Sequence, residues 1–249
     1  TLGTDLIARG QEVIIHLSCK DWNRNALQSR GWELASGGFE NVLCLSGDCP
    51  TSGYEGQAPG VFDIDSVALL KMFTDMNAGL EMPLRNGGRS KPMQHTSFLK
   101  GAVVNNFKLR ENEVMPQYFK LAKKIDTGAD FIINQLGYDA RKQDELMKYM
   151  RHKGLDVPVL CNVYVLSGPA SRFFNSVKIP GCLVTDELHE VCQKHAQSLD
   201  KGKAFFLEFA AKQVAIGKGL GYHGAYIGGH IQFDDYMRIL DLTESFGED

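Results

Sequence analysis

The chain has 249 residues, with 27 lysines and arginines, 30 aspartates and glutamates, and a formal net charge of −3 at pH 7. These charges form no long runs of one sign, so electrostatics does not favour nucleic acid or an acidic membrane surface as a partner. No stretch approaches the roughly 20 apolar residues that cross a bilayer, and no charged-then-apolar signal opens the chain. We therefore expect a cytoplasmic protein that acts on small molecules.

The six cysteines predict reduced thiols rather than a metal site. Cys19, Cys44 and Cys161 lie inside apolar segments, and no pair has the short spacing that holds zinc. Unpaired thiols of this kind are typical of a cytosolic protein.

Six apolar runs have the character of buried strands, and helical patterns separate them. This alternation favours βα units and a parallel sheet. The length suits a single α/β domain, so we predict one TIM-type (β/α)8 barrel domain over residues 1–249. We expect the first two strands to precede Thr1, where the chain begins inside a helical pattern. The predicted strands are Val13–Cys19, Asn41–Leu45, Ala102–Asn105, Phe131–Gln135, Val157–Leu166 and Ala225–Gly228.

Several helices have ends that the sequence marks. Gly128 is placed to end the helix before the fourth strand, in the left-handed conformation. Asp139 can cap a helix through Met150, and Thr185 opens another. The segment Leu84–Lys91, rich in glycine and basic residues, predicts a loop.

The segment Phe205–Ile216 predicts an apolar-rich helix that ends at Gly217. The run Gly217–Gly221 superficially resembles a dinucleotide-binding loop. Because it precedes a strand rather than following one, we interpret it as a connection from a helix to a strand.

Polar side chains follow the predicted strands. If the sheet is a barrel, the carboxyl ends of its strands meet at one mouth. The residues there are rich in hydrogen-bonding groups and lack a His, Asp and Glu grouping that would hold a catalytic metal. They favour a polar heterocyclic ligand and no metal. The set comprises His16, Ser18, Ser46–Asp48, Asn105–Lys108, Gln135–Asp139, Ser167, Gly168 and Gly228–His230.

Five of these and neighbouring side chains have both a functional and a structural interpretation. Asp48 follows a buried strand, where a carboxylate is desolvated unless paired, which favours a role in a site. Gln135 could bind the edge of a pterin or flavin, or bond to backbone. His16 is a ligand contact or a core histidine. By composition alone Lys124 belongs to a solvated helix face, and Lys108 meets a phosphate or is a surface cation.

Taken in order, segments spread over nearly the whole chain resemble the methylenetetrahydrofolate reductase family of flavin-dependent eight-fold barrels. No single segment is decisive, but their order and spacing match the family. The segments are His16–Cys19, Asn41–Asp48, Val61–Ser66, Gly101–Asn105, Lys124–Asp130, Gln135–Asp139 and Ile179–Gly181.

The resemblance implies that NAD(P)H reduces a bound FAD or FMN, and that the reduced flavin then reduces 5,10-methylenetetrahydrofolate to 5-methyltetrahydrofolate. Asp48 falls at the acidic position beside the isoalloxazine, where its charge favours a cationic folate. Gln135 falls where the family binds the pterin and the reductant. The residues at flavin-contacting positions are His16, Ser18, Leu45, Ser46, Gly47, Asp48, Phe62, Asp63, Ala102, Val104, Lys108 and Lys124.

The chain departs from the family pattern at three positions. Ser46 stands where many members have arginine, and Val104 and Lys108 replace a common tyrosine and histidine. The family's general acid is a glutamate on the first barrel strand, which we expect to precede Thr1.

A second hypothesis is a non-reducing folate-binding or methyl-transfer subunit that works with a corrinoid or electron-transfer partner. Under either hypothesis we expect a homo-oligomer or a complex with a partner subunit. The residues leave open NADH, NADPH or a protein as the electron donor.

Overall fold

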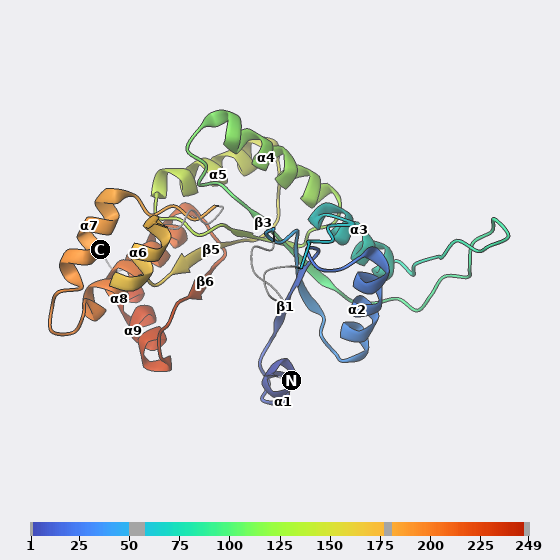
Figure 1. The fold of residues 1–249 in the computed structure, drawn as a ribbon, viewed down its shortest axis with the longest axis horizontal. Helices are drawn as coiled ribbons and strands as arrows, with labels where there is room; N and C mark the ends of the chain where they lie inside the picture. The colour runs from blue at the N-terminus through green and yellow to red at the C-terminus, as the bar shows by residue number, and fades with distance from the viewer. Residues whose placement is uncertain (1, 50–57, 177–180, 247–249) are drawn as a thin grey trace. The chain divides into compact units, whose positions relative to one another are not determined.

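The computed structural model describes residues 2–49, 58–176 and 181–246, and Figure 1 labels its elements. The strands are hydrogen-bonded in chain order, β1-β2-β3-β4-β5-β6. All six lie within the predicted apolar runs or extend them by at most three residues, which confirms an α/β fold with a parallel sheet in the strand order of a TIM-type barrel. The strands are β1 (Ile14–Ser18), β2 (Asn41–Leu45), β3 (Leu99–Val104), β4 (Phe131–Asn134), β5 (Val159–Tyr164) and β6 (Gly224–Gly228).

Helices separate the strands, as the βα pattern predicts. Within the described residues they are α1 (Leu2–Ala8), α2 (Arg24–Ser36), α3 (Ser66–Asn77), α4 (Glu111–Asp126), α5 (Ala140–Lys153), α6 (Gly168–Ser176), α7 (Asp186–His195), α8 (Lys203–Leu220) and α9 (Phe233–Ser245).

The chain divides into two compact units, and the single barrel domain stays a prediction. The first unit comprises the described residues among 1–103 and 120–132. In it β1 pairs with β2 in parallel, so that Ser18 lies opposite Leu45 at the strand ends. Figure 1 shows α2 beside α3. Gly31 permits this packing, because a Cβ there would lie 2.8 Å from the Phe73 ring and 2.9 Å from Met76.

The second unit comprises the described residues among 104–119 and 133–249. In it β5 and β6 pair in parallel, and Figure 1 shows α6 beside α7 and α8 beside α9. Tyr118, on the part of α4 that belongs to this unit, stacks on Tyr149 of α5 with ring centroids 4.6 Å apart. Tyr222 buries its ring and donates its hydroxyl to the Gln143 carbonyl at 3.1 Å.

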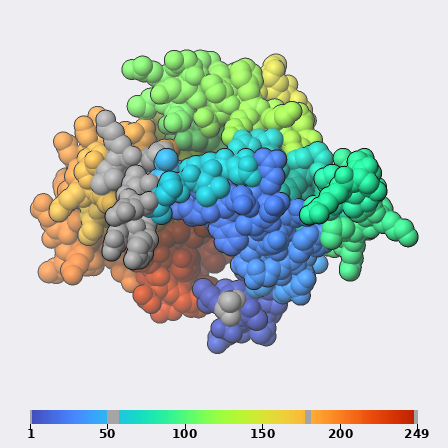
Figure 2. Space-filling view, turned by 45° about the vertical axis from the view of Figure 1, so that its right-hand side comes forward, coloured from blue at the N-terminus to red at the C-terminus, as the bar shows by residue number. Residues whose placement is uncertain are grey.

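Most of the predicted helix boundaries are confirmed. The side chain of Asp139 accepts from the Arg141 N–H and caps α5, and Thr185 caps α7 in the same way. Gly128, just past α4, has a φ of +105°. The segment Leu84–Lys91 forms no helix or strand; it carries a turn, which Figure 2 shows in blue-green at the end of a projecting loop.

The prediction for the end of α8 is wrong. The helix runs past Gly217 to Leu220, and Gly221, with a φ of +92°, is its C-terminal cap. Gly217 is instead buried inside the helix, where a Cβ would lie 3.1 Å from the Cβ of Cys161 on β5. The glycine therefore serves close packing of helix on strand, and of the predicted connection only Gly221 lies outside the helix.

Candidate functional site

The end of β1 touches the loop that follows β2. Gly47 has a φ of +84°, and a Cβ built on it would lie 2.1 Å from the Ser18 Oγ. Glycine suits both this left-handed backbone and this close approach. The Ser18 hydroxyl also donates to the Ser46 carbonyl at 3.5 Å and accepts from the Lys20 N–H at 3.3 Å. The structure thus brings together three of the predicted flavin-contacting residues.

Ser46 connects the end of β2 to the start of α3. Its hydroxyl donates to the Ser66 Oγ and accepts from the Ser66 N–H, both at 3.2 Å. Ser66 is the first residue of α3, and Asp65 is its N-cap. Leu45, the last residue of β2, is half-buried beside this connection. The small hydroxyl residue at position 46 therefore has a structural use that the sequence did not reveal.

Asp48 is exposed. No hydrogen bond or ion pair joins its carboxylate to another residue of the described ranges. The expectation that the neighbouring strand desolvates Asp48 is wrong, because the left-handed Gly47 turns the chain out of the buried β2 strand before Asp48 is reached. Pro50, which ends the predicted run, lies outside the described residues. A ligand role for Asp48 stays a prediction.

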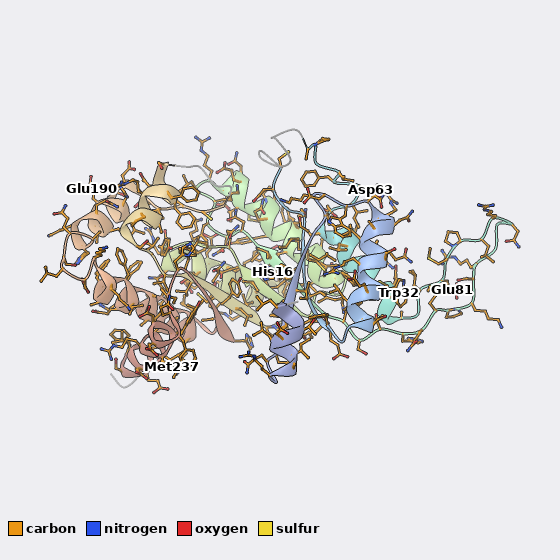
Figure 3. The ribbon with its side chains drawn as sticks, turned by 60° about the horizontal axis from the view of Figure 1, so that its bottom comes forward. His16, Trp32, Asp63, Glu81, Glu190 and Met237 are labelled. Atoms are coloured by element: carbon orange, nitrogen blue, oxygen red, sulfur yellow. The ribbon has the colours of Figure 1, made fainter. Side chains whose placement is uncertain are left out.

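The segment before α3 presents Phe62 and Asp63. Phe62 is 38% exposed and has a φ of +42°. The Asp63 carboxylate accepts from Nε of Arg24 at 2.9 Å and from its Nη2 at 3.0 Å. In Figure 3 Asp63 lies near α2, the helix that begins with Arg24. The sequence analysis did not identify Arg24 as a functional residue. Its position at the start of a helix, next to the Asn23 cap, does not indicate a contact with Asp63.

Lys124 is buried, and the prediction that it belongs to a solvated helix face is wrong. Its side chain is 8% exposed, and Nζ donates to the Val103 carbonyl of β3 at 2.6 Å. Burial, followed by repulsion from Lys120, lowers the pKa of Lys124 to about 8. A signal for this burial was present, since Lys124 continues the buried stripe of Val114, Tyr118 and Leu121 on α4.

Two further predicted residues lie on β3 and are buried. Ala102 has no exposed surface, and Val104 is 2% exposed. Ala102 lies opposite Cys44 of β2, so its methyl group is placed by the sheet register. Their contact with a cofactor stays a prediction.

In the second unit, Gln135 lies where β4 ends. Its Oε1 accepts from the Leu136 N–H at 2.8 Å, and its backbone N–H donates to the Val104 carbonyl at 2.8 Å. Gly181, with a φ of +88°, lies against it, because a Cβ there would be 2.9 Å from the Gln135 Nε2 and 2.6 Å from the Asn105 Nδ2. Two amide side chains therefore meet one glycine. Ile179 and Pro180, the other residues of that predicted segment, lie outside the described residues.

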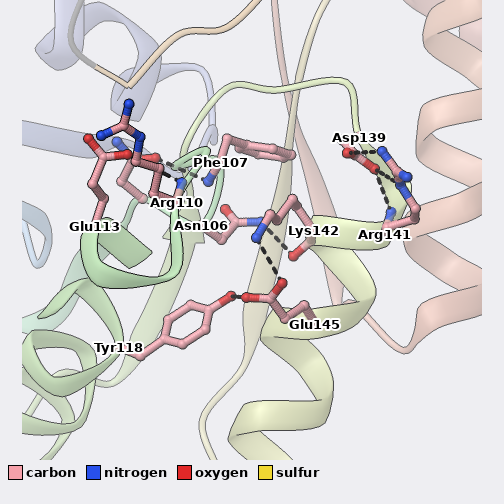
Figure 4. Close-up of polar contacts among 10 residues, drawn as sticks. Asn106, Phe107, Arg110, Glu113, Tyr118, Asp139, Arg141, Lys142 and Glu145 are labelled. Atoms are coloured by element: carbon pink, nitrogen blue, oxygen red, sulfur yellow. Dashed lines mark hydrogen bonds and ion pairs between the residues drawn. The ribbon is translucent and has the colours of Figure 1, made fainter. Parts of the chain in front are cut away.

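The connection from β3 to α4 carries Lys108, which is half-buried, and is anchored to α5 by the network in Figure 4. Asn106 donates to the Lys142 carbonyl at 3.0 Å. The Lys142 ammonium and the Tyr118 hydroxyl each contact Glu145 at 2.9 Å. Burial, followed by the hydrogen bond to Glu145, raises the pKa of Tyr118. A phosphate contact by Lys108 stays a prediction.

His16 lies on β1, as Figure 3 shows. Its side chain is exposed, yet the surrounding protein atoms exclude enough water to lower its pKa. His16 therefore does not lie in the buried core. A ligand contact and satisfaction by neighbouring backbone both stay predictions.

The described residues lack two kinds of feature. They contain no group of three or more His, Cys, Asp or Glu side chains arranged to hold a metal ion. None of their helices is both long and apolar enough to cross a membrane.

The fold and the candidate residues define a class of protein. Parallel strands in chain order, each followed by polar side chains at its carboxyl end, are typical of α/β proteins that bind small molecules. A family model described as methylenetetrahydrofolate reductase matches residues 7–221. The chain belongs to the methylenetetrahydrofolate reductase family.

Two curated relatives agree with this family. Methylenetetrahydrofolate reductase 2 of Saccharomyces cerevisiae is 26% identical over 167 residues, which are 64% of this chain and 25% of the yeast protein. The 5,10-methylenetetrahydrofolate reductase of Pectobacterium carotovorum is 24% identical over 180 residues, which are 71% of this chain and 52% of that protein. The chain therefore matches about a quarter and about half of the length of these relatives.

One solved structure is similar in fold. It is a protein from Clostridium thermocellum, described as uncharacterized and as binding two copies of 5-methyl-5,6,7,8-tetrahydrofolic acid. The TM-score is 0.60 at 12% identity, and the match covers 99% of this chain and 77% of that one. At this identity the likeness supports the fold.

Proposed function

We propose that this protein reduces 5,10-methylenetetrahydrofolate to 5-methyltetrahydrofolate with NADH or NADPH and a bound flavin. In the overall reaction the nicotinamide gives a hydride and the solvent gives a proton, so that the methylene bridge becomes a methyl group on N5. The observation that carries the proposal is the family match over residues 7–221, which includes the carboxyl ends of β1 to β5. The folate ligand of the similar Clostridium thermocellum structure is the product of this reaction and is consistent with it.

The residues of the first unit fit a flat, polar cofactor such as FAD or FMN. Gly47 leaves its backbone uncovered by a Cβ, Asp48 presents a carboxylate that no described residue engages, and Phe62 exposes an aromatic ring. When bound, a flavin supplies the hydride-carrying chemistry, and the protein needs only to hold the reactants and set the local charge. This explains how a site can serve redox chemistry without a cluster of acids and bases.

In this proposal Asp48 acts through its charge. Its exposed carboxylate stabilises the positive charge that develops on the folate when the methylene bridge opens at N10, before the hydride arrives, and stabilising this charged species accelerates the reaction. Gln135 would orient the pterin, because an amide presents a donor and an acceptor side by side. Its Nε2 is the group left for this task, since its Oε1 is engaged by Leu136.

The first test is the visible absorbance spectrum of the purified protein, before and after NADH or NADPH is added without oxygen. We expect a yellow protein that bleaches with one of these donors. A protein that carries no flavin and takes up neither FAD nor FMN would exclude the proposal.

The second test is Asp48→Asn. We expect an unchanged flavin content, a reduction of 5,10-methylenetetrahydrofolate slowed about a hundredfold, and a much smaller effect on oxidation of the nicotinamide donor. The control is Asp126→Asn, which neutralises an exposed aspartate at the end of α4. Equal slowing of both half-reactions would show that Asp48 does not act on the folate.

A second candidate is a folate-binding or methyl-transfer subunit that does not reduce its ligand. The similar Clostridium thermocellum structure favours it, because that protein is described by folate binding and not by reduction. A colourless protein that binds 5-methyltetrahydrofolate, and that gains no reductase activity with FAD or FMN, would support this candidate.

A further inference from the structure

Phe62 holds its aromatic side chain in a backbone conformation that is rare for such a residue. Its φ is +42°, and 38% of the side chain is exposed. Left-handed backbone is strained in a bulky residue other than glycine and persists only where the surrounding structure imposes it. The segment around it, residues 58–65, begins in light blue on the surface shown in Figure 2.

Three contacts impose this conformation, two of them on the residues adjoining Phe62. On one side the Val61 N–H donates to the Lys20 carbonyl at 2.6 Å. On the other side the Asp63 carboxylate binds Arg24. Further along, Ser66 is held by the Ser46 hydroxyl. Phe62 is thus fixed by its neighbours and not by burial of its own ring.

The Arg24 contact is the strongest of the three by its chemistry. The Arg24 backbone N–H and Nε reach one oxygen of Asp63 at 2.8 and 2.9 Å, and Nη2 reaches the other at 3.0 Å. Bidentate, charge-assisted pairs of this kind fix orientation as well as adding energy. These hydrogen bonds lower the pKa of Asp63 to about 2, so its carboxylate stays ionised over the neutral range.

Both oxygens of Asp63 are therefore already used by a neighbouring side chain. We propose that Arg24 is a positioning residue, which acts through Asp63 to hold Phe62 in place for contact with the flavin. Asp63 belongs to this clamp through both oxygens of its carboxylate. The inference rests on the proposed function, because it takes Phe62 to be a flavin contact.

The test compares Arg24→Gln with the wild type in two measurements. The first uses no flavin: hydrogen exchange of the peptide covering residues 58–66 should speed up in Arg24→Gln, because Val61 and its neighbours lose an anchor. The second is the dissociation constant for FAD, from quenching of flavin fluorescence. We expect it to rise about tenfold, since a loop that must be ordered on binding lowers affinity.

The control is Arg30→Gln, which removes a pair between half-buried Arg30 and exposed Glu33 on the same helix and should change neither measurement. Arg24→Lys keeps the charge without the forked geometry, and its FAD dissociation constant should stay closer to that of Arg24→Gln than to the wild type. In a Phe62→Ala background, Arg24→Gln should change FAD binding less than twofold, because the clamp then has no ring to position.

The outcomes separate the two proposals. If the wild type does not bind FAD, the proposed function fails, whatever the exchange measurement shows. If the wild type binds FAD and Arg24→Gln leaves both exchange and affinity unchanged, the positioning role is excluded. An equal loss of affinity in the wild-type and Phe62→Ala backgrounds would also exclude it, because Arg24 would then act by a route that bypasses Phe62.

Discussion

Replacing Lys124 by methionine should stabilise the protein at neutral pH. Lys124 is 8% exposed, and its pKa falls from 10.5 to about 8 because burial disfavours its charge. This difference corresponds to about 3 kcal/mol of lost unfolding free energy at pH 7. Methionine removes the buried charge with a side chain of similar length. It also leaves the Val103 carbonyl without its donor, which costs about 1 kcal/mol. We expect a net gain of about 2 kcal/mol at pH 7.

The gain should depend on pH in a defined direction. Between pH 8 and 10.5 the unfolded chain keeps a proton on Lys124 that the folded chain has lost, so the wild-type free energy of unfolding rises with pH. The wild type recovers about 2 kcal/mol of this contribution from pH 7 to pH 9.5. The advantage of Lys124→Met should therefore shrink to about zero near pH 9.5.

The assay is urea unfolding of the wild type and the variant at several pH values from 7 to 9.5. Lys123→Met is the control, because Lys123 is adjacent on α4 and exposed. Subtracting the pH dependence of Lys123→Met removes the effects of other groups that titrate in this range. The reasoning is refuted if Lys124→Met differs from the wild type by the same free energy at every pH, since the buried amine would then keep an ordinary pKa.

Two further changes test the backbone and the candidate site. Gly47→Ala should lower the urea midpoint, because a left-handed alanine costs about 1–2 kcal/mol and its Cβ would meet Ser18 Oγ. Gly38→Ala measures the backbone cost alone, because Gly38 has a φ of +75° and nothing lies within 4 Å of its Cβ position. An equal loss of unfolding free energy in the two variants would contradict the clash with Ser18. Gln135→Ala should weaken binding of 5-methyltetrahydrofolate about three- to tenfold in a titration, as expected for the loss of one hydrogen bond. The flavin content should not change. Loss of flavin from the variant would contradict a role of Gln135 in binding the pterin.

The strands were predictable because the physics that buries them acts on short, continuous apolar runs. β4 is buried at all four positions, and the same residues form an unbroken apolar run in the sequence up to Asn134. Caps were predictable at Asp139 and Thr185 for a similarly local reason, since a side chain there bonds to the backbone N–H groups of the next turn. The prediction that the helix ends at Gly217 was wrong because the role of this glycine is not local. It leaves room for Cys161, which lies on a strand far away in the sequence.

The candidate site was less predictable, because its side chains take their roles from distant partners. Nothing near Asp63 in the sequence indicates that Arg24 uses both of its oxygens. Lys123 and Lys124 are indistinguishable by composition and differ only in which side of α4 they occupy. The buried stripe of α4 distinguishes them, because Lys124 continues the spacing of its apolar residues and Lys123 does not.

The aspartates around β2 and α3 differ in what their carboxylates already do, and this difference bears on function. Asp63 is held by Arg24. Asp65 caps α3 and pairs with Lys120 at 2.9 Å. Asp48, on the loop after β2, engages no described residue. A carboxylate that the fold does not use is free to respond to a ligand's charge, whereas a paired one must first lose its partner. Among these three residues, Asp48 is therefore the one that the proposed function pairs with a positive charge on the bound substrate.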